Sequence, residues 1–258
     1  MGSISLTATF RIIMNDKIAQ IQQRIDDAIM VIANSRKPRN YLGASSIGEE
    51  CDRKLWYSFH EPKRINDPRI HRIFDLGHLL ESYCLSMLKH AGYEVFHDDG
   101  GEQFGFTDEE VAGHCDGVVI IDDTPHLLEI KSANDKRFAE MVNHGVEKSD
   151  PVYYTQMQAY MKYMELDRAL FMAINKNTSA LHMEIVRYEK IKADYAINRG
   201  KEIVRGTKEE AQRKYTSSAF FKCKWCDHRS SCWGEEPPKP TEEGAPPIKL
   251  GRSLLLGK

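Results

Sequence analysis

Two short runs that read as strands, 118–121 (Val-Val-Ile-Ile) and 126–130 (His-Leu-Leu-Glu-Ile), flank a turn-forming cluster at residues 122–125 (Asp-Asp-Thr-Pro). Aliphatic runs on both sides of such a cluster predict two β-strands joined as a hairpin. If the turn is centred on the cluster, antiparallel pairing joins residues whose numbers sum to about 245 to 247. This register sets Asp116 opposite Glu129, so the pattern predicts that two carboxylates meet across the hairpin.

Three other stretches repeat apolar residues at the spacing of an α-helix. Residues 10–34 carry isoleucines at that spacing, residues 70–90 have one apolar side, and residues 151–165 begin with Pro151, which suits the first turn of a helix. The apolar side of the second helix consists of Ile73, Phe74, Gly77, Leu80, Tyr83, Cys84 and Leu88. We expect the first helix to pack on the cysteine-rich region described below, and binding to a partner is the alternative.

The predicted hairpin carries the residues of a metal-dependent phosphodiesterase site. Because side chains alternate along a strand, Glu129 and Lys131 share one face, with the carbonyl of Ile130 between them. With Asp116 they form a set of hard oxygen ligands beside an ammonium, which suits Mg²⁺ or Mn²⁺. Lys131 would orient or deprotonate a water, or stabilise a phosphate. The alternative is an edge hairpin with ordinary surface charges, because Glu-x-Lys is a frequent triplet.

Two further pairs of polar residues lie at helical spacing. His78 and Glu81 share one edge of their helix, where an imidazole could complete the metal shell and a carboxylate could hold a second ion or a water. Gln156 and Tyr160 lie one turn apart and could hydrogen-bond a phosphate and the lysine. Taken alone, the first pair is a solvated pair and the second is a core tyrosine with a polar neighbour.

Cysteine spacing gives a second signal. Three cysteines fall within ten residues near the C-terminal end, and a fourth lies far upstream. These four are Cys51, Cys223, Cys226 and Cys232. The chain shows no signal-peptide pattern and no apolar run of membrane-spanning length, so we expect a reducing cytoplasm, where metal ligation is favoured over disulfides. Four thiolates hold either zinc or an iron-sulfur cluster; one Cys-x-x-Cys pair with two single cysteines fits the cluster better. Cys84 and Cys115, in apolar surroundings, are predicted to be buried thiols.

The motifs resemble those of the PD-(D/E)XK nuclease superfamily, in the branch of RecB-type exonuclease domains. The similarity rests on residues 113–117 (Gly-His-Cys-Asp-Gly), 129–132 (Glu-Ile-Lys-Ser) and 156–160 (Gln-Met-Gln-Ala-Tyr), within about residues 42–233. The four spaced cysteines are similar to those of the iron-sulfur members of that branch, the AddB-type helicase-nuclease subunit and the CRISPR-adaptation nucleases. Cys115 stands where the proline of the motif's name would be, but the RecB-like branch commonly lacks that proline.

The resemblance implies a role for each matching residue. The metal shell would be His78, Asp116, Glu129 and the Ile130 carbonyl. Lys131 would be catalytic, Gln156 and Tyr160 would form the trailing motif, and the four cysteines would carry a [4Fe-4S] cluster. Glu81 ranks second to His78 as a ligand, because a related viral exonuclease group uses a helical glutamate.

Length and composition fit one catalytic domain. A chain of 258 residues with 41% hydrophobic residues can bury a three-layer core, and it contains no internal repeat. We therefore expect an N-terminal helical segment (1–41), a nuclease domain (42–233) and a disordered proline-rich tail (234–258). The expected fold is an α/β/α sandwich with a central mixed sheet, as in restriction endonucleases, and a helical cap that bears the iron-sulfur cluster.

The charge distribution bears on the substrate. The net charge is −2, yet residues 98–123 hold nine acidic residues and no Lys or Arg, while residues 187–214 hold nine basic residues against five acidic ones. Removing the acidic stretch leaves a basic remainder that favours DNA. Arg53 and Lys54 are candidate phosphate contacts, as are Arg69, Arg72, Arg199 and Arg205.

These features predict a Mg²⁺- or Mn²⁺-dependent DNA exonuclease that acts on DNA ends or single strands in recombination, repair or phage DNA processing. The alternatives are a structure-specific or end-trimming endonuclease and a catalytically idle DNA-binding or scaffold protein. The chain contains no helicase Walker motif, so unwinding would come from a partner, either a helicase or a single-strand annealing protein. The predicted location is the cytoplasm of a bacterial or phage-infected cell, away from the membrane.

Overall fold

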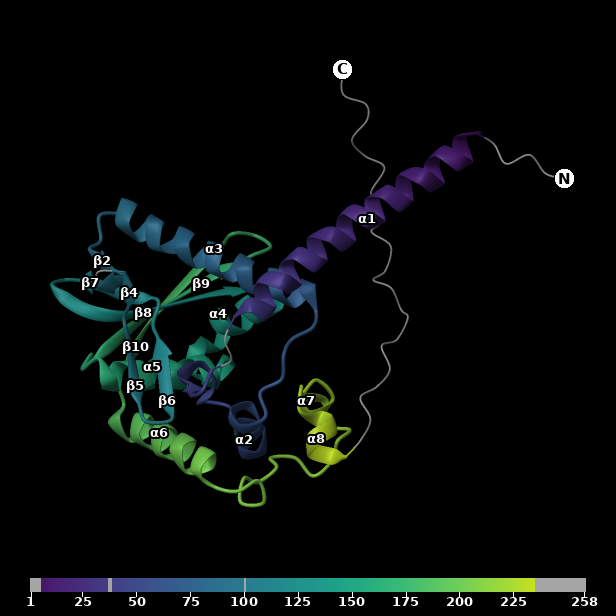
Figure 1. The fold of residues 1–258 in the computed structure, drawn as a ribbon. Helices are drawn as coiled ribbons and strands as arrows, with labels where there is room; N and C mark the ends of the chain where they lie inside the picture. The colour runs from purple at the N-terminus through teal and green to yellow at the C-terminus, as the bar shows by residue number, and fades with distance from the viewer. Residues whose placement is uncertain (1–5, 37–38, 100, 235–258) are drawn as a thin grey trace. The chain divides into compact units, whose positions relative to one another are not determined.

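The computed structural model describes residues 6–36, 39–99 and 101–234 (Figure 1). The chain divides into two compact units, Met1–Lys214 and Tyr215–Lys258. The helices of the described residues are α1 (Leu6–Ser35), a 3₁₀ turn η1 (Ala44–Ser46), α2 (Asp52–His60), α3 (Pro68–His90), α4 (Asp135–Ser149), α5 (Pro151–Tyr163), α6 (Lys190–Arg205), α7 (Phe221–Lys224) and α8 (Arg229–Trp233). The strands are β1 (Leu42–Gly43), β2 (Val95–Phe96), β3 (Asp98–Asp99), β4 (Glu102–Gln103), β5 (Gly105–Asp108), β6 (Val111–His114), β7 (Gly117–Ile121), β8 (Thr124–Ala133), β9 (Arg168–Asn175) and β10 (Leu181–Arg187).

The centre of the first unit is a mixed five-stranded sheet in the order β10-β9-β8-β7-β2. β8 and β9 are parallel, with Glu129 beside Phe171, and the other neighbours in this sheet are antiparallel. The parallel connection from β8 to β9 runs through α4 and α5, as a crossover between parallel strands requires. The predicted mixed sheet is confirmed.

Helices cover both faces of this sheet because the central strands are apolar on both sides. Leu127 and Phe171 pack with residues of α4 and α5 in one core, whereas Leu128 and Met172 pack with Cys84 of α3 in another. Neighbouring residues of β8 thus enter opposite cores, as the strand period demands. The result is the predicted three-layer α/β/α sandwich (Figure 1).

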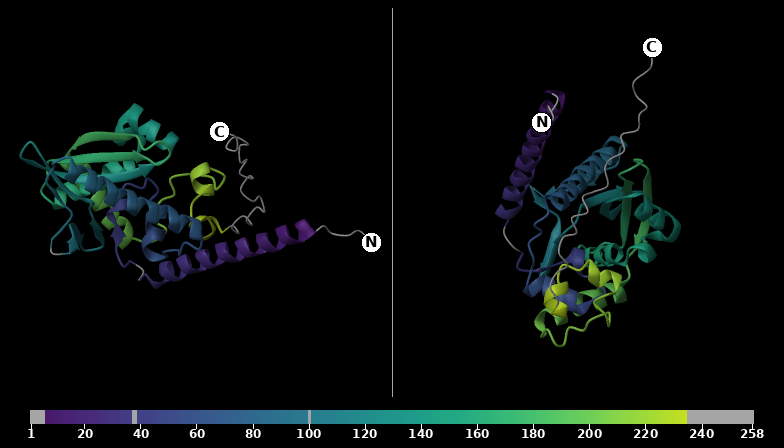
Figure 2. Two further views of the ribbon diagram at one scale, coloured as in Figure 1. Left: turned by 90° about the horizontal axis from the view of Figure 1, so that it is seen from above. Right: turned by 90° about the vertical axis from the view of Figure 1, so that its right-hand side faces the viewer.

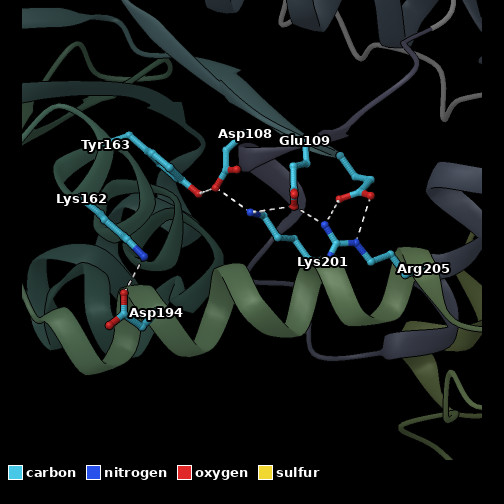
Figure 3. A network of polar contacts seen from close by, with 8 residues as sticks. Asp108, Glu109, Lys162, Tyr163, Asp194, Lys201 and Arg205 are labelled. Atoms are coloured by element: carbon cyan, nitrogen blue, oxygen red, sulfur yellow. Dashed lines mark hydrogen bonds and ion pairs between the residues drawn. The ribbon is translucent and has the colours of Figure 1, made fainter.

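A smaller sheet in the order β1-β6-β5 packs beside η1 and α6. The acidic turn between β5 and β6 is tied to α6 by ion pairs: Lys201 contacts Asp108 and Glu109, and Arg205 contacts Glu109 and Glu110 (Figure 3). The acidic stretch and the basic stretch therefore neutralise each other in part. Arg205, a predicted phosphate contact, thus already has two carboxylate partners, and its contact with DNA stays a prediction.

The three predicted helices all form, with small differences in extent. α5 ends at Tyr163, before the expected Glu165, which has a positive φ of 54°. In α3 the apolar side is buried only in its C-terminal half: Cys84 is fully buried, but Phe74 is 44% exposed. The N-terminal half of α3 lies along α1, with ion pairs such as Arg72 with Asp26.

The second unit is described by itself and contains α7 and α8. α8 ends at Trp233 and is capped by Gly234, whose φ of 68° is the left-handed conformation that glycine adopts at helix ends. The predicted disordered tail, apart from Gly234, lies outside the described residues, and the predicted boundaries at 41 and 233 stay predictions. None of the helices in the described ranges is both long and apolar enough to cross a bilayer.

Candidate active site at the edge of β8

The β7–β8 hairpin has the predicted register. Gly117 pairs with Leu128 and Ile121 with Thr124, so continuing the ladder by one residue sets Asp116 opposite Glu129. The turn is shorter than expected: Asp122 and Asp123 alone form it, with φ values of 47° and 57°, and the next two residues already belong to β8. Positive φ at both central residues matches the twist of a tight hairpin.

The ladder stops at the point where the site begins. Gly117 has a φ of 148°, and a Cβ there would lie 2.6 Å from the carbonyl oxygen of Phe96, so only glycine fits at the start of β7. Beyond it, the amide of Ile130 donates to Asp116 Oδ2 over 2.6 Å in place of a strand partner. Because the N–H and C=O of one strand residue point to the same edge, the Ile130 carbonyl faces this side too.

Glu129 and Lys131 form a buried ion pair on the α5 face of β8. Lys131 Nζ lies 2.5 Å from Glu129 Oε1; the Glu129 side chain is fully buried and that of Lys131 is 22% exposed. The second carboxylate oxygen, Oε2, accepts a 3.2 Å hydrogen bond from Gln156 Nε2. Gln156 therefore holds the carboxylate, which is a more specific contact than the predicted one to phosphate.

The electrostatics of the pair follow from burial and neighbouring charge. Burial raises the pKa of Glu129 to about 7; Lys131 opposes this rise, and Asp116 adds to it. Burial alone would lower the pKa of Lys131, but the charges of Glu129 and Asp116 outweigh it and raise the pKa above its usual range. Lys131 is thus an ammonium in this arrangement, which favours charge stabilisation over proton abstraction.

α3 brings a third carboxylate to this group. Burial raises the pKa of Glu81, and the charge of Asp116 raises it further, so the two carboxylates lie within electrostatic reach of each other. His78 Nδ1 lies 3.5 Å from Glu81 Oε2, and the His78 side chain is 72% exposed. Glu81 and His78 thus both stay candidates for completing a metal shell, and their predicted ranking stays a prediction.

Tyr160 has a different partner from the one expected. Its buried hydroxyl donates a 2.7 Å hydrogen bond to the carbonyl of His114. A Cβ on Gly113 would lie 2.7 Å from the same hydroxyl, so a residue without a side chain is needed beneath it. Tyr160 therefore fixes the end of β6, two residues before Asp116.

Two side chains beside the site were not predicted. The ring of Tyr153 lies 5.1 Å from Lys131 Nζ, and His97 Nδ1 lies 3.2 Å from the carbonyl oxygen of Asp116. The sequence could have indicated Tyr153, because this residue precedes Gln156 by three positions and so shares its helix face. No sequence pattern indicates His97, since it lies in a loop whose position depends on the packing of β2 against β7.

The donor set suits a divalent cation. Three carboxylates, those of Glu81 in α3, Asp116 between β6 and β7, and Glu129 in β8, lie within electrostatic reach of one another, and their repulsion is of the kind that Mg²⁺ or Mn²⁺ relieves. In their present positions two of them bind the Ile130 amide and Lys131. Accordingly, no group of three or more His, Cys, Asp or Glu side chains in the described part of the chain is gathered closely enough to hold a metal.

The predicted cysteine ligands are distributed over both units. Cys51 is the N-cap residue of α2 in the first unit, and Cys223, Cys226 and Cys232 belong to the second. All four are half-buried, whereas Cys84 and Cys115 are buried as predicted. In the described part of the chain, these thiols do not form part of a group of three or more metal-ligating side chains.

The predicted phosphate contacts bind within the protein. Arg53 Nε donates to the carbonyl of Ala211 over 2.6 Å, and Lys54 Nζ lies 2.5 Å from Glu49 Oε2. Arg199 bonds Asp52 and the carbonyl of Glu49. These contacts tie α2 to its surroundings, so a phosphate would share these side chains with partners inside the protein.

Comparison with known proteins bears on the fold. No protein-family model and no curated protein matches the chain. The fold is shared with SSO0001. That crystal structure matches at a TM-score of 0.52 and 14% identity, over 82% of this chain and 96% of the other. The chain is also similar to the alkaline exonuclease of Laribacter hongkongensis, with a TM-score of 0.45 and 16% identity over 65% of this chain and 88% of the other. A phage-related exonuclease from Haemophilus somnus 129PT matches with a TM-score of 0.40 and 14% identity over 50% of this chain and 67% of the other. At these identities the likeness concerns the fold alone.

Proposed function

We propose that this protein is a Mg²⁺- or Mn²⁺-dependent deoxyribonuclease that acts as an exonuclease. The observation that carries the proposal is the buried Glu129–Lys131 pair at the point where the β7–β8 ladder opens, with Asp116 beside it. A fully buried carboxylate is costly unless its charge has a purpose or a partner. Here the pair, the open edge and the carboxylate of Glu81 form one group.

Each residue has a role in this proposal. Asp116, Glu129 and the Ile130 carbonyl would hold the ion, with Glu81 or His78 completing the set. When bound, the ion would polarise the scissile phosphate and activate a water. Lys131 would stabilise charge on the phosphate, Gln156 would orient Glu129, and Tyr160 would fix the strand that precedes Asp116.

The first experiment tests for cleavage and assigns it. Linear DNA labelled separately at the 5′ and 3′ ends, and covalently closed circular DNA, are incubated with Mg²⁺ or Mn²⁺. We expect mononucleotides or short products from one end and no cleavage of the circle. Cutting of the circle would favour the alternative, an endonuclease. Absence of cleavage on every substrate would favour the other alternative, an idle DNA-binding or scaffold protein.

Variants then connect cleavage to the site. Asp116→Ala, Glu129→Gln and Lys131→Ala should each lower cleavage by about 10²-fold or more, because they act mainly on the transition state, while DNA binding persists. Lys190→Ala and Glu140→Gln are matched controls, because these exposed residues only pair with neighbours on their own helices. Full activity in the Lys131 variant would contradict the assigned role.

We further propose that Cys51, Cys223, Cys226 and Cys232 carry a [4Fe-4S] cluster, with Zn²⁺ as the alternative. The support is the spacing of the thiols in the sequence, since such a ligand set suits either group. Protein purified without oxygen should be brown and contain about four iron and four sulfide per chain. One zinc in colourless protein would favour the alternative, and absence of both metals would remove the proposal.

We also propose that Arg53 and Lys54 contact DNA phosphates, by exchanging the partners described above. A helicase or single-strand annealing protein would supply strand separation in recombination, repair or phage DNA processing. If the two side chains contact phosphates, replacing both should flatten the dependence of DNA affinity on salt by about two counterions. An unchanged slope with lower thermal stability would leave them a structural role only.

A further inference from the structure

One stripe of α1 is apolar and exposed. Five of its side chains are between 40% and 61% exposed. They are Met14, Ile18, Ile21, Ile25 and Ile32. Soluble chains rarely expose so many large aliphatic groups in a row, and such stripes mark interfaces.

The spacing of this stripe indicates what covers it. Together with the exposed Ala28, the positions 14, 18, 21, 25, 28 and 32 alternate steps of four and three residues. This is the a/d heptad seam of paired helices. The face of α1 that contacts α3 is a different one, with Asp26, Ile29 and Ala33 half-buried.

We propose that α1 pairs in antiparallel orientation with α1 of a second copy of this chain. Antiparallel seams set a positions against d positions. When paired residues sum to 46, the seam is complementary to itself: Ile21 meets Ile25, Ile18 meets Ala28, and Met14 meets Ile32. The small Ala28 opposite Ile18 lets the two rows interdigitate, and the two-fold axis passes near Gln23.

The position of α1 leaves room for this pairing. Its contacts with α3 and the segment before it involve residues from Asp26 onward, including Asn34 with Arg64 and Arg36 with Asp75. Figures 1 and 2 show the N-terminal half of α1 projecting beyond the sandwich of the first unit. An antiparallel partner would bring its own first unit to that projecting half, whereas a parallel pair would crowd both at one end.

The seam from Met14 to Ile32 is roughly 27 Å long. This is short compared with the interfaces of stable dimers, so we expect a dissociation constant on the order of micromolar. Light scattering at about 100 µM, far above such a constant, should give twice the chain mass of 29.6 kDa. A mass of one chain at this concentration would overturn the proposal and leave the stripe to another partner.

Two matched variants of the full chain test the seam. Ile21→Asp should raise the dissociation constant of the dimer by at least tenfold. Gln20→Asp adds the same charge at the adjacent position outside the seam and should leave the constant unchanged. Circular dichroism confirms that both variants fold. Equal dimerisation of the two variants would overturn the proposal.

Crosslinking tests the orientation. A mixture of Ile21→Cys and Ile25→Cys proteins should form a disulfide between the two variants, identified by peptide mass mapping, and either protein alone should not. Efficient crosslinking of each variant with itself would indicate a parallel pair and overturn the antiparallel arrangement. These readouts do not depend on nuclease activity.

Discussion

Lys131 keeps its charge inside the site because two carboxylates offset the cost of burying it. Glu129 lies 2.5 Å away, and Asp116 adds a second negative charge. Removing one partner of such a pair costs more than the pair contributes, since it leaves an uncompensated buried charge. We therefore expect Glu129→Ala to lower the free energy of unfolding by about 3 kcal/mol in addition to its effect on cleavage.

Burial also protects the thiols of Cys84 and Cys115 from chemical modification. It raises the pKa of Cys84 to about 11 and that of Cys115 to about 12. At pH 8 the reactive thiolate would then be about one part in a thousand or less. Brief treatment of folded protein with iodoacetamide should leave both residues unmodified by mass spectrometry, and unfolding in guanidinium should expose them. Rapid labelling in the folded state would contradict the packing described.

At the scale of elements, two tyrosines of α5 bond the smaller sheet, the first near the site and the second away from it. Tyr160 bonds the His114 carbonyl near Asp116, whereas Tyr163, one turn later, bonds Asp108 away from the site. Tyr160→Phe should cost about 1 kcal/mol of stability, because it removes the part-buried hydrogen bond to the His114 carbonyl. It should also lower cleavage, while Tyr163→Phe destabilises without that loss. Urea unfolding measures the stability of the variants, and initial rates measure their cleavage. Equal activity of the two variants would contradict a specific role of Tyr160 at the site.

The hairpin turn carries a cost of its own. Asp123 adopts a φ of 57°, which is unfavourable for residues with a Cβ by about 1–2 kcal/mol. Asp123→Gly removes this cost but loses more backbone entropy on folding. The net result should be a stabilisation of the protein by roughly 0.5–1 kcal/mol. The control Thr124→Gly, in the strand beyond the turn, should destabilise it. The midpoints of denaturant unfolding measure the stability of both variants, and a loss of stability in Asp123→Gly would contradict the turn geometry.

At the scale of the whole molecule, the network in Figure 3 limits which cations can meet DNA. Arg205 is held by Glu109 and Glu110, and Lys201 by Asp108 and Glu109. Arg205→Ala should leave the salt dependence of DNA affinity unchanged, because it removes no phosphate contact. It should slightly lower the melting temperature at low salt and less at high salt, since exposed ion pairs are screened. A flatter salt slope would restore Arg205 as a phosphate contact.

The sequence by itself determined the local features of this protein. The register that sets Asp116 opposite Glu129 follows from two apolar runs and one turn, and the helices follow from their apolar spacing. These features depend on residues near one another in the chain, where the period of the backbone dictates which side chains share a face.

Only the tertiary structure decided the partners of long polar side chains. Tyr160 bonds a carbonyl 46 residues earlier, and Arg205 bonds Glu109, which is 96 residues earlier. The electrostatic influence of Asp116 on Glu81 likewise depends on how α3 lies on the sheet. A flexible side chain reaches several groups once the elements pack, so its partner is fixed by packing between distant segments, which the local pattern does not encode.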